Sequence, residues 1–472
     1  MTRSATIVGS GPNGLAAALA LARDGIHVTV LEAESEIGGG TRSHRPFTTV
    51  DLLVDHCAGF HPMAVGSPAV AGLEQHGLTW RWPEIDCAHP LLDDAAALLH
   101  RSVNETAVGL GADGKRWKAL FWQPSSSYDR LSADLLGPVV HLPRHPLLLA
   151  RFGAPTALPA AVLSRAFATP QARALFVGAA AHAMRPLTEV FSSAIGVGIL
   201  TAGHHNGWPV AEGGTAAISR AMHSALIELG ATVQTSTRVA SRADLPSSDI
   251  TIFDTTPSVV ADVLGQELTT RTRRSYNRFR HGPAAFKVDL AVRGGVPWTD
   301  PRVAQAGTVH VGGSAEDTVA AEAAVAAGRM PDRPFVLVGQ QFVADPQRAD
   351  GDVVPLYAYA HVPAGLDHDV TDVVIDRIEQ FAPGLRSRIV ETVTTSPQSF
   401  AGGNANFVGG DILCGTSSPT QLLLGPRPGR DPYRTGTPGF SLCSAAAPPG
   451  PGAHGMAGLN AARRALDDLL KR

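Results

Sequence analysis

The first thirty residues alternate short apolar runs with one alanine-rich stretch. Residues 5–8 are apolar, residues 15–22 are rich in alanine and leucine, and residues 28–31 form a second apolar run. Short apolar runs bounded by glycine are typical of buried strands, whereas an alanine- and leucine-rich stretch is typical of a helix. The pattern therefore predicts a strand, a turn, a helix and a second strand.

The turn between this strand and this helix contains three glycines. Gly9 permits a tight turn, Gly11 lets backbone N–H groups approach a diphosphate, and Gly14 allows close packing of helix on sheet. Glu32 ends the second strand eighteen residues after Gly14, where a carboxylate can accept both hydroxyls of an adenosine ribose. The predicted dinucleotide contacts are Gly9, Gly11, Pro12, Asn13, Gly14, Glu32 and Ala33.

A second glycine motif, residues 36–42, follows the second strand directly. Here the sequence resembles the flavoprotein branch that contains glutathione reductase-like folds, amine oxidases and phytoene desaturases. The resemblance implies FAD as the cofactor, with the chain passing beside the flavin diphosphate and Arg42 neutralising a phosphate. The contacts it implies in this motif are Gly39, Gly40, Thr41 and Arg42.

Residues 109–114 match the same glycine spacing without its context. No strand of adequate length precedes them, and Asp113-Gly114 is typical of a turn before the helical residues 115–121. We therefore expect no second nucleotide site and no domain for bound NAD(P)H.

Two later segments carry further predicted parts of the cofactor domain. In this superfamily a helix over residues 215–229, a strand over residues 232–235 and a strand over residues 250–255 return the chain to that domain, and Val239 holds the adenine through its backbone. An ordinary αβ unit without cofactor contact is the alternative.

The C-terminal residues 439–470 predict a strand, a small-residue loop and a final helix. A glycine-rich helix start offers N–H donors that suit the N1–C2=O edge of a reduced flavin. His454, Gly455 and Met456 are predicted to line the isoalloxazine, and Ser444 stands where many relatives place an acid for the ribityl chain.

Motifs spread over almost the whole chain resemble the phytoene dehydrogenase-related NAD(P)/FAD-dependent oxidoreductases, with a more distant likeness to the pyridine nucleotide-disulphide oxidoreductase domain 2 proteins.

The fold implied is α/β, with a Rossmann-type, glutathione reductase-like FAD-binding domain interleaved with an α+β substrate domain. The FAD domain is expected from residues 1–75, 208–280 and 401–472, and the substrate domain from residues 76–207 and 281–400. The chain departs from the family pattern at residues 400–403, Pro451 and Ala453. The motifs that carry the resemblance are 55–58 (DHCA), 61–62 (HP), 88–91 (AHPL), 99–102 (LHRS), 207–209 (GWP), 286–289 (FKVD), 297–298 (PW), 406–411 (NFVGGD) and 454–456 (HGM).

Charge and cysteine content narrow the choice of partners and compartment. With 39 basic and 42 acidic side chains the net charge is −3, which predicts neither nucleic acid nor anionic lipid as a partner. The four cysteines lie far apart and show no zinc spacing, which favours a reducing cytoplasm and no metal. No signal peptide is evident, and prolines and arginines interrupt the apolar residues 131–202. Membrane attachment is therefore expected to be peripheral at most, through these helices.

Lys287 is the first candidate for a catalytic role. The segment from residue 282 to Trp298 looks like the amine oxidase strand whose lysine holds a water at flavin N5. The alternative is a lysine on an exposed strand face. His61, His204 and His205 are candidate bases because histidine titrates near neutrality, although satisfied or surface histidines are the alternative.

Other polar side chains have open roles. Asn404, Asn406 and Asp411 either orient substrate or close a loop.

The function predicted first is a dehydrogenase or desaturase that moves a hydride from a small, largely apolar metabolite to flavin N5, with O₂ or a quinone as acceptor. Three alternatives remain: an amine oxidase, a flavin-dependent isomerase, and a non-catalytic FAD-binding partner protein. The amine oxidase would need an aromatic cage beside the flavin, and the low number of tyrosines, five in the whole chain, weakens that alternative. A homodimer is possible.

Overall fold

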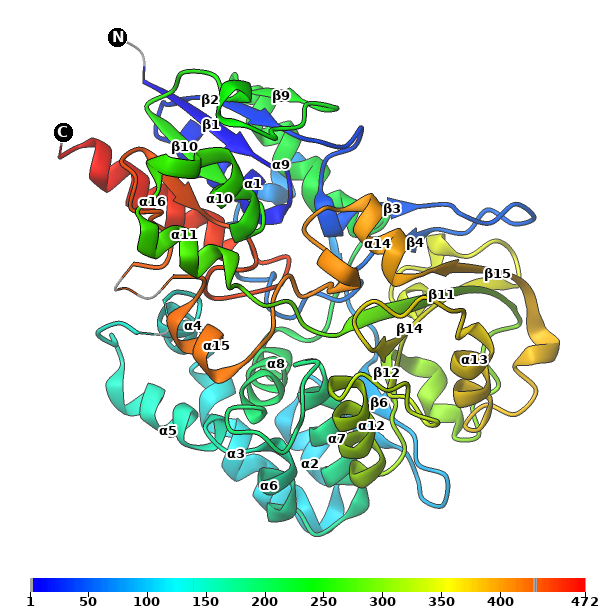
Figure 1. Cartoon of the computed structure of the whole chain (residues 1–472). Helices are drawn as coiled ribbons and strands as arrows, with labels where there is room; N and C mark the ends of the chain where they lie inside the picture. Colours follow the sequence, from blue (N-terminus) through cyan, green and yellow to red (C-terminus); the bar gives the residue numbers. More distant parts are fainter. Residues whose placement is uncertain (1–2, 139, 428, 430, 472) are drawn as a thin grey trace.

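The computed structural model describes residues 3–138, 140–427, 429 and 431–471. One sheet is parallel and has the order β16-β10-β1-β2-β9. Its strands are nearly continuous apolar runs, as expected for a sheet covered on both faces. These strands are β1 (Ser4–Val8), β2 (His27–Leu31), β9 (Thr232–Gln234), β10 (Ile250–Phe253) and β16 (Phe440–Leu442). Three stretches far apart in the sequence therefore build one Rossmann-type sheet (Figure 1).

Helices cover both faces of this sheet. On one face α1 packs between α9 and α16, and its small alanines let the three helices approach closely. On the other face α10 and α11 bury an apolar cluster over β10. The helices are α1 (Pro12–Arg23), α9 (Ala216–Glu228), α16 (Met456–Leu469), α10 (Pro257–Leu264) and α11 (Thr270–Asn277).

A second, mixed sheet has the order β15-β11-β14-β13-β12-β6-β7. All its neighbours are antiparallel except β12 and β6. Alternate residues of β11, such as Val288 and Leu290, pack under α13 (Thr371–Glu379) in an apolar core. The opposite face carries polar and aromatic side chains, including Lys287 and Tyr359. The strands are β6 (Ile85–His89), β7 (Ala97–Leu99), β11 (Ala284–Arg293), β12 (Ala306–Val311), β13 (Val336–Gly339), β14 (Val353–Val362) and β15 (Ile389–Thr395).

A cap of helices packs on the polar face of the second sheet around Trp117, Phe121 and Phe176. Most of the predicted helical stretch 131–202 lies in this cap. Gly109 ends α2, and α3 begins at Gly114. Residues 109–114, which match the glycine spacing without its context, therefore join two helices. The cap helices are α2 (Val103–Gly109), α3 (Gly114–Ser126), α4 (Tyr128–Leu135), α5 (Pro146–Thr156), α6 (Ala160–Leu163), α7 (Pro170–Ala181), α8 (Ser193–Asn206) and α12 (Ala315–Ala326).

Short elements complete the described chain. The remaining strands are β3 (Ser43–His44), β4 (Val54–Asp55), β5 (Trp80–Arg81) and β8 (Val210–Ala211), and the remaining α-helices are α14 (Pro397–Gly403) and α15 (Pro419–Leu424). Within the described residues, no single helix combines the length and apolar character needed to cross a bilayer.

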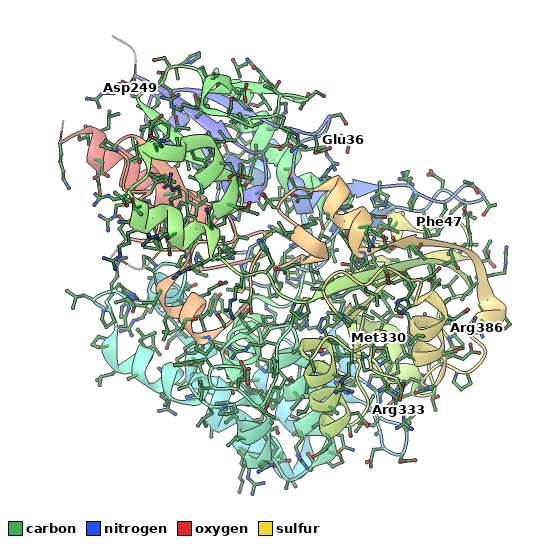
Figure 2. All side chains as sticks on the ribbon, viewed as in Figure 1. Glu36, Phe47, Asp249, Met330, Arg333 and Arg386 are labelled. Atoms are coloured by element: carbon green, nitrogen blue, oxygen red, sulfur yellow. The ribbon has the colours of Figure 1, made fainter. Side chains whose placement is uncertain are left out.

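The β3/β4 hairpin links the two sheets. Phe47, between its strands, packs with Ala291 of β11 and Val353 of β14, at the edge of the molecule shown in Figure 2. Glu391 of β15 accepts hydrogen bonds from the backbone N–H groups of Thr48 and Thr49. The chain that follows β2 of the first sheet thus packs directly against the second sheet.

A buried network of charges lies where this hairpin meets the second sheet. Arg348 donates to Asp55 Oδ2 at 2.7 Å and to Asp345 Oδ2 at 3.1 Å. Lys287 Nζ donates to Asp289 Oδ2 at 2.6 Å and to the carbonyl of Asp55 at 2.8 Å. Burial alone would raise the pKa of Asp55, but the adjacent Arg348 guanidinium holds it below its usual value. The network ties β4 to both β11 and the segment before β14.

Replacing Arg348 with methionine should destabilise the protein strongly, because Asp55 and Asp345 would be left as buried carboxylates without a cation. We expect a loss of about 3–5 kcal/mol, measured by urea unfolding. The matched control is Arg293→Met, which removes an exposed ion pair with Asp352 and should cost about 1 kcal/mol or less. Equal losses in the two variants would contradict the role assigned to the network.

Candidate functional site

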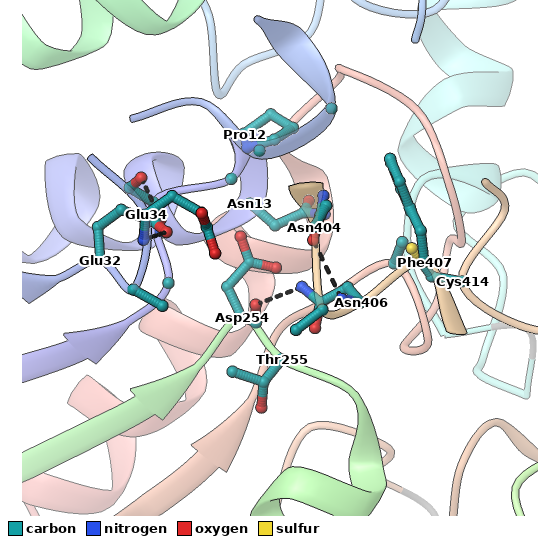
Figure 3. A pocket seen from close by; sticks show the side chains of 18 of the residues that line it. Pro12, Asn13, Glu32, Glu34, Asp254, Thr255, Asn404, Asn406, Phe407 and Cys414 are labelled. Carbon is teal, nitrogen blue, oxygen red and sulfur yellow. Dashed lines mark hydrogen bonds between the residues drawn. The ribbon is translucent and has the colours of Figure 1, made fainter. Parts of the chain in front are cut away.

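A cavity opens at the carboxyl ends of β1, β2 and β10, where open α/β sheets bind their ligands. Its walls come from the first and last parts of the chain and from the loops that follow β9 and β10 (Figure 3). The predicted cofactor contacts found in its lining are Gly9, Gly11, Pro12, Asn13, Glu32, Ala33, Gly39, Gly40, Thr41, Arg42 and Val239.

The first glycine turn is too crowded for side chains. Gly9 has φ +99°, in the left-handed region that favours glycine. A Cβ on Gly11 would lie 2.6 Å from Asp254 Oδ2, and a Cβ on Gly14 would lie 2.2 Å from the carbonyl oxygen of Gly9. Gly14 lies behind the lining, and its N–H donates to Asp254 Oδ2 at 2.8 Å. The glycines therefore expose the backbone of the turn and the start of α1 to the cavity.

Glu32 is held in place at the end of β2. Its Oε2 accepts from the N–H of Ser10 at 2.8 Å and also from the Ser10 hydroxyl, and its Oε1 accepts from the N–H of Glu34 at 2.9 Å. The carboxylate is thus oriented before any ligand arrives. It can still accept hydrogen bonds from hydroxyl groups in the cavity.

The second glycine motif is bonded to the first. The N–H of Gly38 donates to the carbonyl of Ser10 at 2.9 Å. Arg42 donates through Nε to the carbonyl of Gly39 at 2.8 Å and through Nη2 to the carbonyl of Gly403 at 2.6 Å. The Arg42 side chain therefore joins the N-terminal motif to the last part of the chain while lining the cavity.

Asp254 is a lining residue that the sequence interpretation missed. It follows β10, and its backbone carbonyl accepts from Asn406 Nδ2 at 3.0 Å. Burial, with a further contribution from the charge of Glu32, raises the pKa of Asp254 to about 7, although the bond from Gly14 opposes the shift. The signal available in the sequence was an acid directly after a buried strand. Asn404 and Asn406 also line the cavity, whereas Asp411 accepts from the N–H of Gly282 and closes a loop.

The opposite end of the cavity is apolar. Cys57, Phe407, Ile412, Cys414 and Ala445 line it, and Figure 3 shows Phe407 and Cys414 on the far side of Asp254 from Glu32. Burial raises the pKa of the Cys57 thiol to about 12 and that of the Cys414 thiol as well, so both are neutral. Sequence reasoning did not find these residues, because they sit on loops without a periodic pattern.

The C-terminal loop reaches the cavity with residues just before the predicted ones. Pro451, Gly452 and Ala453 line the cavity, in place of the residues that follow them. Gly455 instead caps α16 and packs against α1, because a Cβ there would lie 2.8 Å from Ala16 Cβ. The predicted contacts that lie outside this lining are Ser444, His454, Gly455 and Met456.

His454 and Ser444 have local bonds. His454 Nδ1 accepts from the N–H of Met456 at 3.1 Å, and burial lowers the pKa of His454 to about 4. The Ser444 hydroxyl accepts from the N–H of Ala446 at 3.3 Å. Both side chains thus stabilise the loop from behind.

Lys287, predicted to hold a water at the flavin, is not among the residues that line the cavity. Besides its bonds to Asp289 and the Asp55 carbonyl, its ammonium lies 4.7 Å from the ring centroid of Tyr357. Two of its three N–H donors are thus bonded to oxygen atoms, and an aromatic ring lies beside the ammonium. Lys287 therefore belongs to the buried charge network behind Cys57.

The three histidines predicted as bases also lie outside the lining. His61 Nε2 is bonded to Thr215 Oγ1 at 3.0 Å, and His204 accepts from Trp117 Nε1 at 2.9 Å. Burial lowers the pKa of each to about 4. His205 is partly exposed and bonded to the carbonyl of Ser125 at 3.0 Å. Each of the three is thus bonded to a neighbouring residue outside the cavity.

Replacing Asp254 with asparagine should change how stability depends on pH. The folded pKa, about 7, exceeds the unfolded value of about 4. The stability that this group supplies is thus present at low pH and lost as pH rises towards 7. Between pH 5 and pH 8 the unfolding free energy of the variant should rise relative to that of the wild type by roughly 2–4 kcal/mol.

The matched control for this experiment is Asp249→Asn, at the exposed opposite end of β10. It should leave the difference between pH 5 and pH 8 unchanged. An Asp254→Asn protein with the pH dependence of the wild type would show that this carboxyl is ionised in the folded state.

Comparisons with known proteins agree with this geometry. The family described as NAD(P)-binding Rossmann-like domain matches residues 7–72. The rat pyridine nucleotide-disulfide oxidoreductase domain-containing protein 2 is 36% identical over 99 residues, which are 21% of this chain and only 17% of that protein.

Solved structures match over the full length. Putrescine oxidase bound to putrescine has a TM-score of 0.63 at 16% identity, and cyclohexylamine oxidase from Brevibacterium oxydans has 0.56 at 14%, each covering 100% of both chains. An oxidoreductase from Methanosarcina mazei has 0.63 at 13%, covering 98% of this chain and 100% of its own. At these identities the likeness is one of fold. The chain therefore contains a Rossmann-like domain and has the fold of putrescine oxidase and cyclohexylamine oxidase.

Proposed function

We propose that the protein is an FAD-dependent oxidoreductase that oxidises a largely apolar small molecule. One observation carries the proposal: a single cavity joins a dinucleotide-binding glycine turn and Glu32 at one end to an apolar pocket around Phe407 at the other. A dinucleotide with a large flat ring system has this distribution of polar and apolar groups. Bound FAD would accept a hydride from the substrate.

The residues present fit the cofactor. Glu32 is placed to accept from the ribose hydroxyls, and the N-terminus of α1 and Arg42 offer positive potential to the diphosphate. The Asn13 side-chain oxygen is buried and has no hydrogen-bond partner among the described residues, so it can accept from a bound molecule. Val239 lies in the lining where the adenine would sit.

The chain's own contribution to the reaction is binding, orientation and exclusion of water. The apolar end presents two neutral thiols and the Phe407 ring. These groups favour contact with a C–H bond of the substrate over contact with a charged group of the substrate. Among the described lining residues none is a histidine or a lysine, so the neighbouring proton would leave to solvent. We propose O₂ or a quinone as the final acceptor.

An amine oxidase is the second candidate, favoured by one specific observation. Tyr357 and Tyr359 of β14 stand with their rings 5.8 Å apart at 85°, and the Tyr357 hydroxyl donates to the carbonyl of Cys57 at the apolar end. Tyr359 also packs against the apolar cluster that contains Phe407 and Cys414. Neither tyrosine is among the residues that line the cavity, so the pair lies behind its apolar end. Two of the solved structures with this fold are amine oxidases, which supports this candidate.

Anaerobic titration of the purified, FAD-loaded protein would test the function. Loss of the oxidised flavin absorbance with apolar metabolites, but not with primary amines, would support the first candidate. Reduction by amines alone would favour the second. Bound FAD that no metabolite reduces would contradict both.

Replacing Glu32 with glutamine should weaken FAD binding about 10- to 100-fold, because charged hydrogen bonds to the ribose are lost. The measurement is fluorescence titration of the apoprotein with FAD. Glu36→Gln, an exposed acid four residues further on, is the matched control and should bind like the wild type. Wild-type affinity in the Glu32→Gln protein would place the adenosine elsewhere.

A further inference from the structure

One stretch of the helical cap has no acidic side chain. Residues 136–188 contain five arginines and neither aspartate nor glutamate, although the whole chain has a net charge of −3. Arg173 pairs with Glu316, and Arg185 pairs with Glu189. Arg144 and Arg151 are exposed, and none of the ion pairs among the described residues includes them. Arg165 is likewise exposed and outside these pairs, so three cations are available to a partner.

Large apolar side chains lie beside these arginines. Leu142 is 95% exposed, Leu147 is 86% exposed and Val140 is 60% exposed. On α5 the exposed positions follow helical spacing, since Leu147 and Arg151 are four residues apart and share a face. The other face is anchored, because Leu148 and Phe152 pack into the cap.

The loop before α5 is held in this exposed position by Asp134. This buried carboxylate accepts from the N–H of Arg144 at 2.7 Å and from the N–H of His145 at 2.9 Å. At the start of the loop, Asn460 Nδ2 of α16 donates to the carbonyl of Leu136 at 2.9 Å. The apolar side chains are thus presented on a fixed backbone.

We propose that this α5 surface, formed by Val140, Leu142, Arg144, Leu147 and Arg151, docks the protein on an anionic lipid bilayer. Apolar side chains next to arginines match the boundary between acyl chains and acidic headgroups. This docking goes beyond the proposed function and does not depend on it.

The geometry points to a helix that lies in the plane of the interface. The 11 residues of α5 span about 16 Å, against a hydrocarbon core of about 30 Å. A bend of 91° separates α5 from the following helical residues. In Figure 1, α5 lies at the outer edge of the cap, away from both sheets, so a flat surface can reach it.

Co-sedimentation of the full-length protein with vesicles tests the proposal. The wild type should pellet with vesicles that mix phosphatidylcholine and phosphatidylglycerol, less with phosphatidylcholine alone, and less at high salt. The Leu142→Gln/Leu147→Gln double variant should lose about tenfold or more of its affinity for the vesicles. The Arg144→Gln/Arg151→Gln double variant should lose the preference for anionic vesicles.

The matched control removes equally exposed apolar side chains elsewhere. Val108 on α2 is 79% exposed and Leu470 after α16 is 70% exposed, so Val108→Gln/Leu470→Gln should bind like the wild type. A wild type that stays in the supernatant with both kinds of vesicle would overturn the proposal. Undiminished vesicle binding of the leucine double variant would also overturn it. So would a wild type that is a dimer and binds no lipid, with the dimer lost in the leucine double variant.

Discussion

The close approach of the first glycine turn to the end of β10 is the constraint on which the rest of the structure depends. Gly11 and Gly14 come so near to Asp254 that any side chain at either position would displace the carboxylate or the backbone. Because β1 pairs with β10, and β10 with β16, this approach also fixes where the middle and last parts of the chain lie. The cavity thus forms between elements whose positions depend on the contact between the glycine turn and Asp254 and on the pairing of β1, β10 and β16.

Much of the fold and part of the site could be predicted from the sequence. The predicted strand, turn, helix and strand at the start are present, and Glu32, Gly40 and Arg42 lie in the lining of the cavity. These predictions rest on local patterns, in which strand period, glycine positions and one acid fall within about forty residues. The successive helices of the cap were predicted for the same reason.

The remaining site residues depend on contacts between distant segments. Lys287 was predicted to face the flavin, but its orientation is decided by Asp289 on the same strand and by Asp55 more than two hundred residues earlier. Asp254 and Phe407 line the same cavity, and Asn406 beside Phe407 is bonded to the carbonyl of Asp254 after β10. The C-terminal loop lines the cavity with residues 451–453, three residues before the predicted ones, because Gly455 is needed where α16 packs on α1. A single sequence contains no local signal for any of these pairings.

The central claim is that FAD lies along this cavity, with its adenosine at Glu32 and its ring at the apolar end. A crystal structure of the protein grown with FAD tests it most directly. The account predicts density in which the ribose hydroxyls bond to Glu32 and the isoalloxazine contacts Cys57 and Phe407. Density for FAD at any other place, or an empty cavity in crystals saturated with FAD, would contradict it.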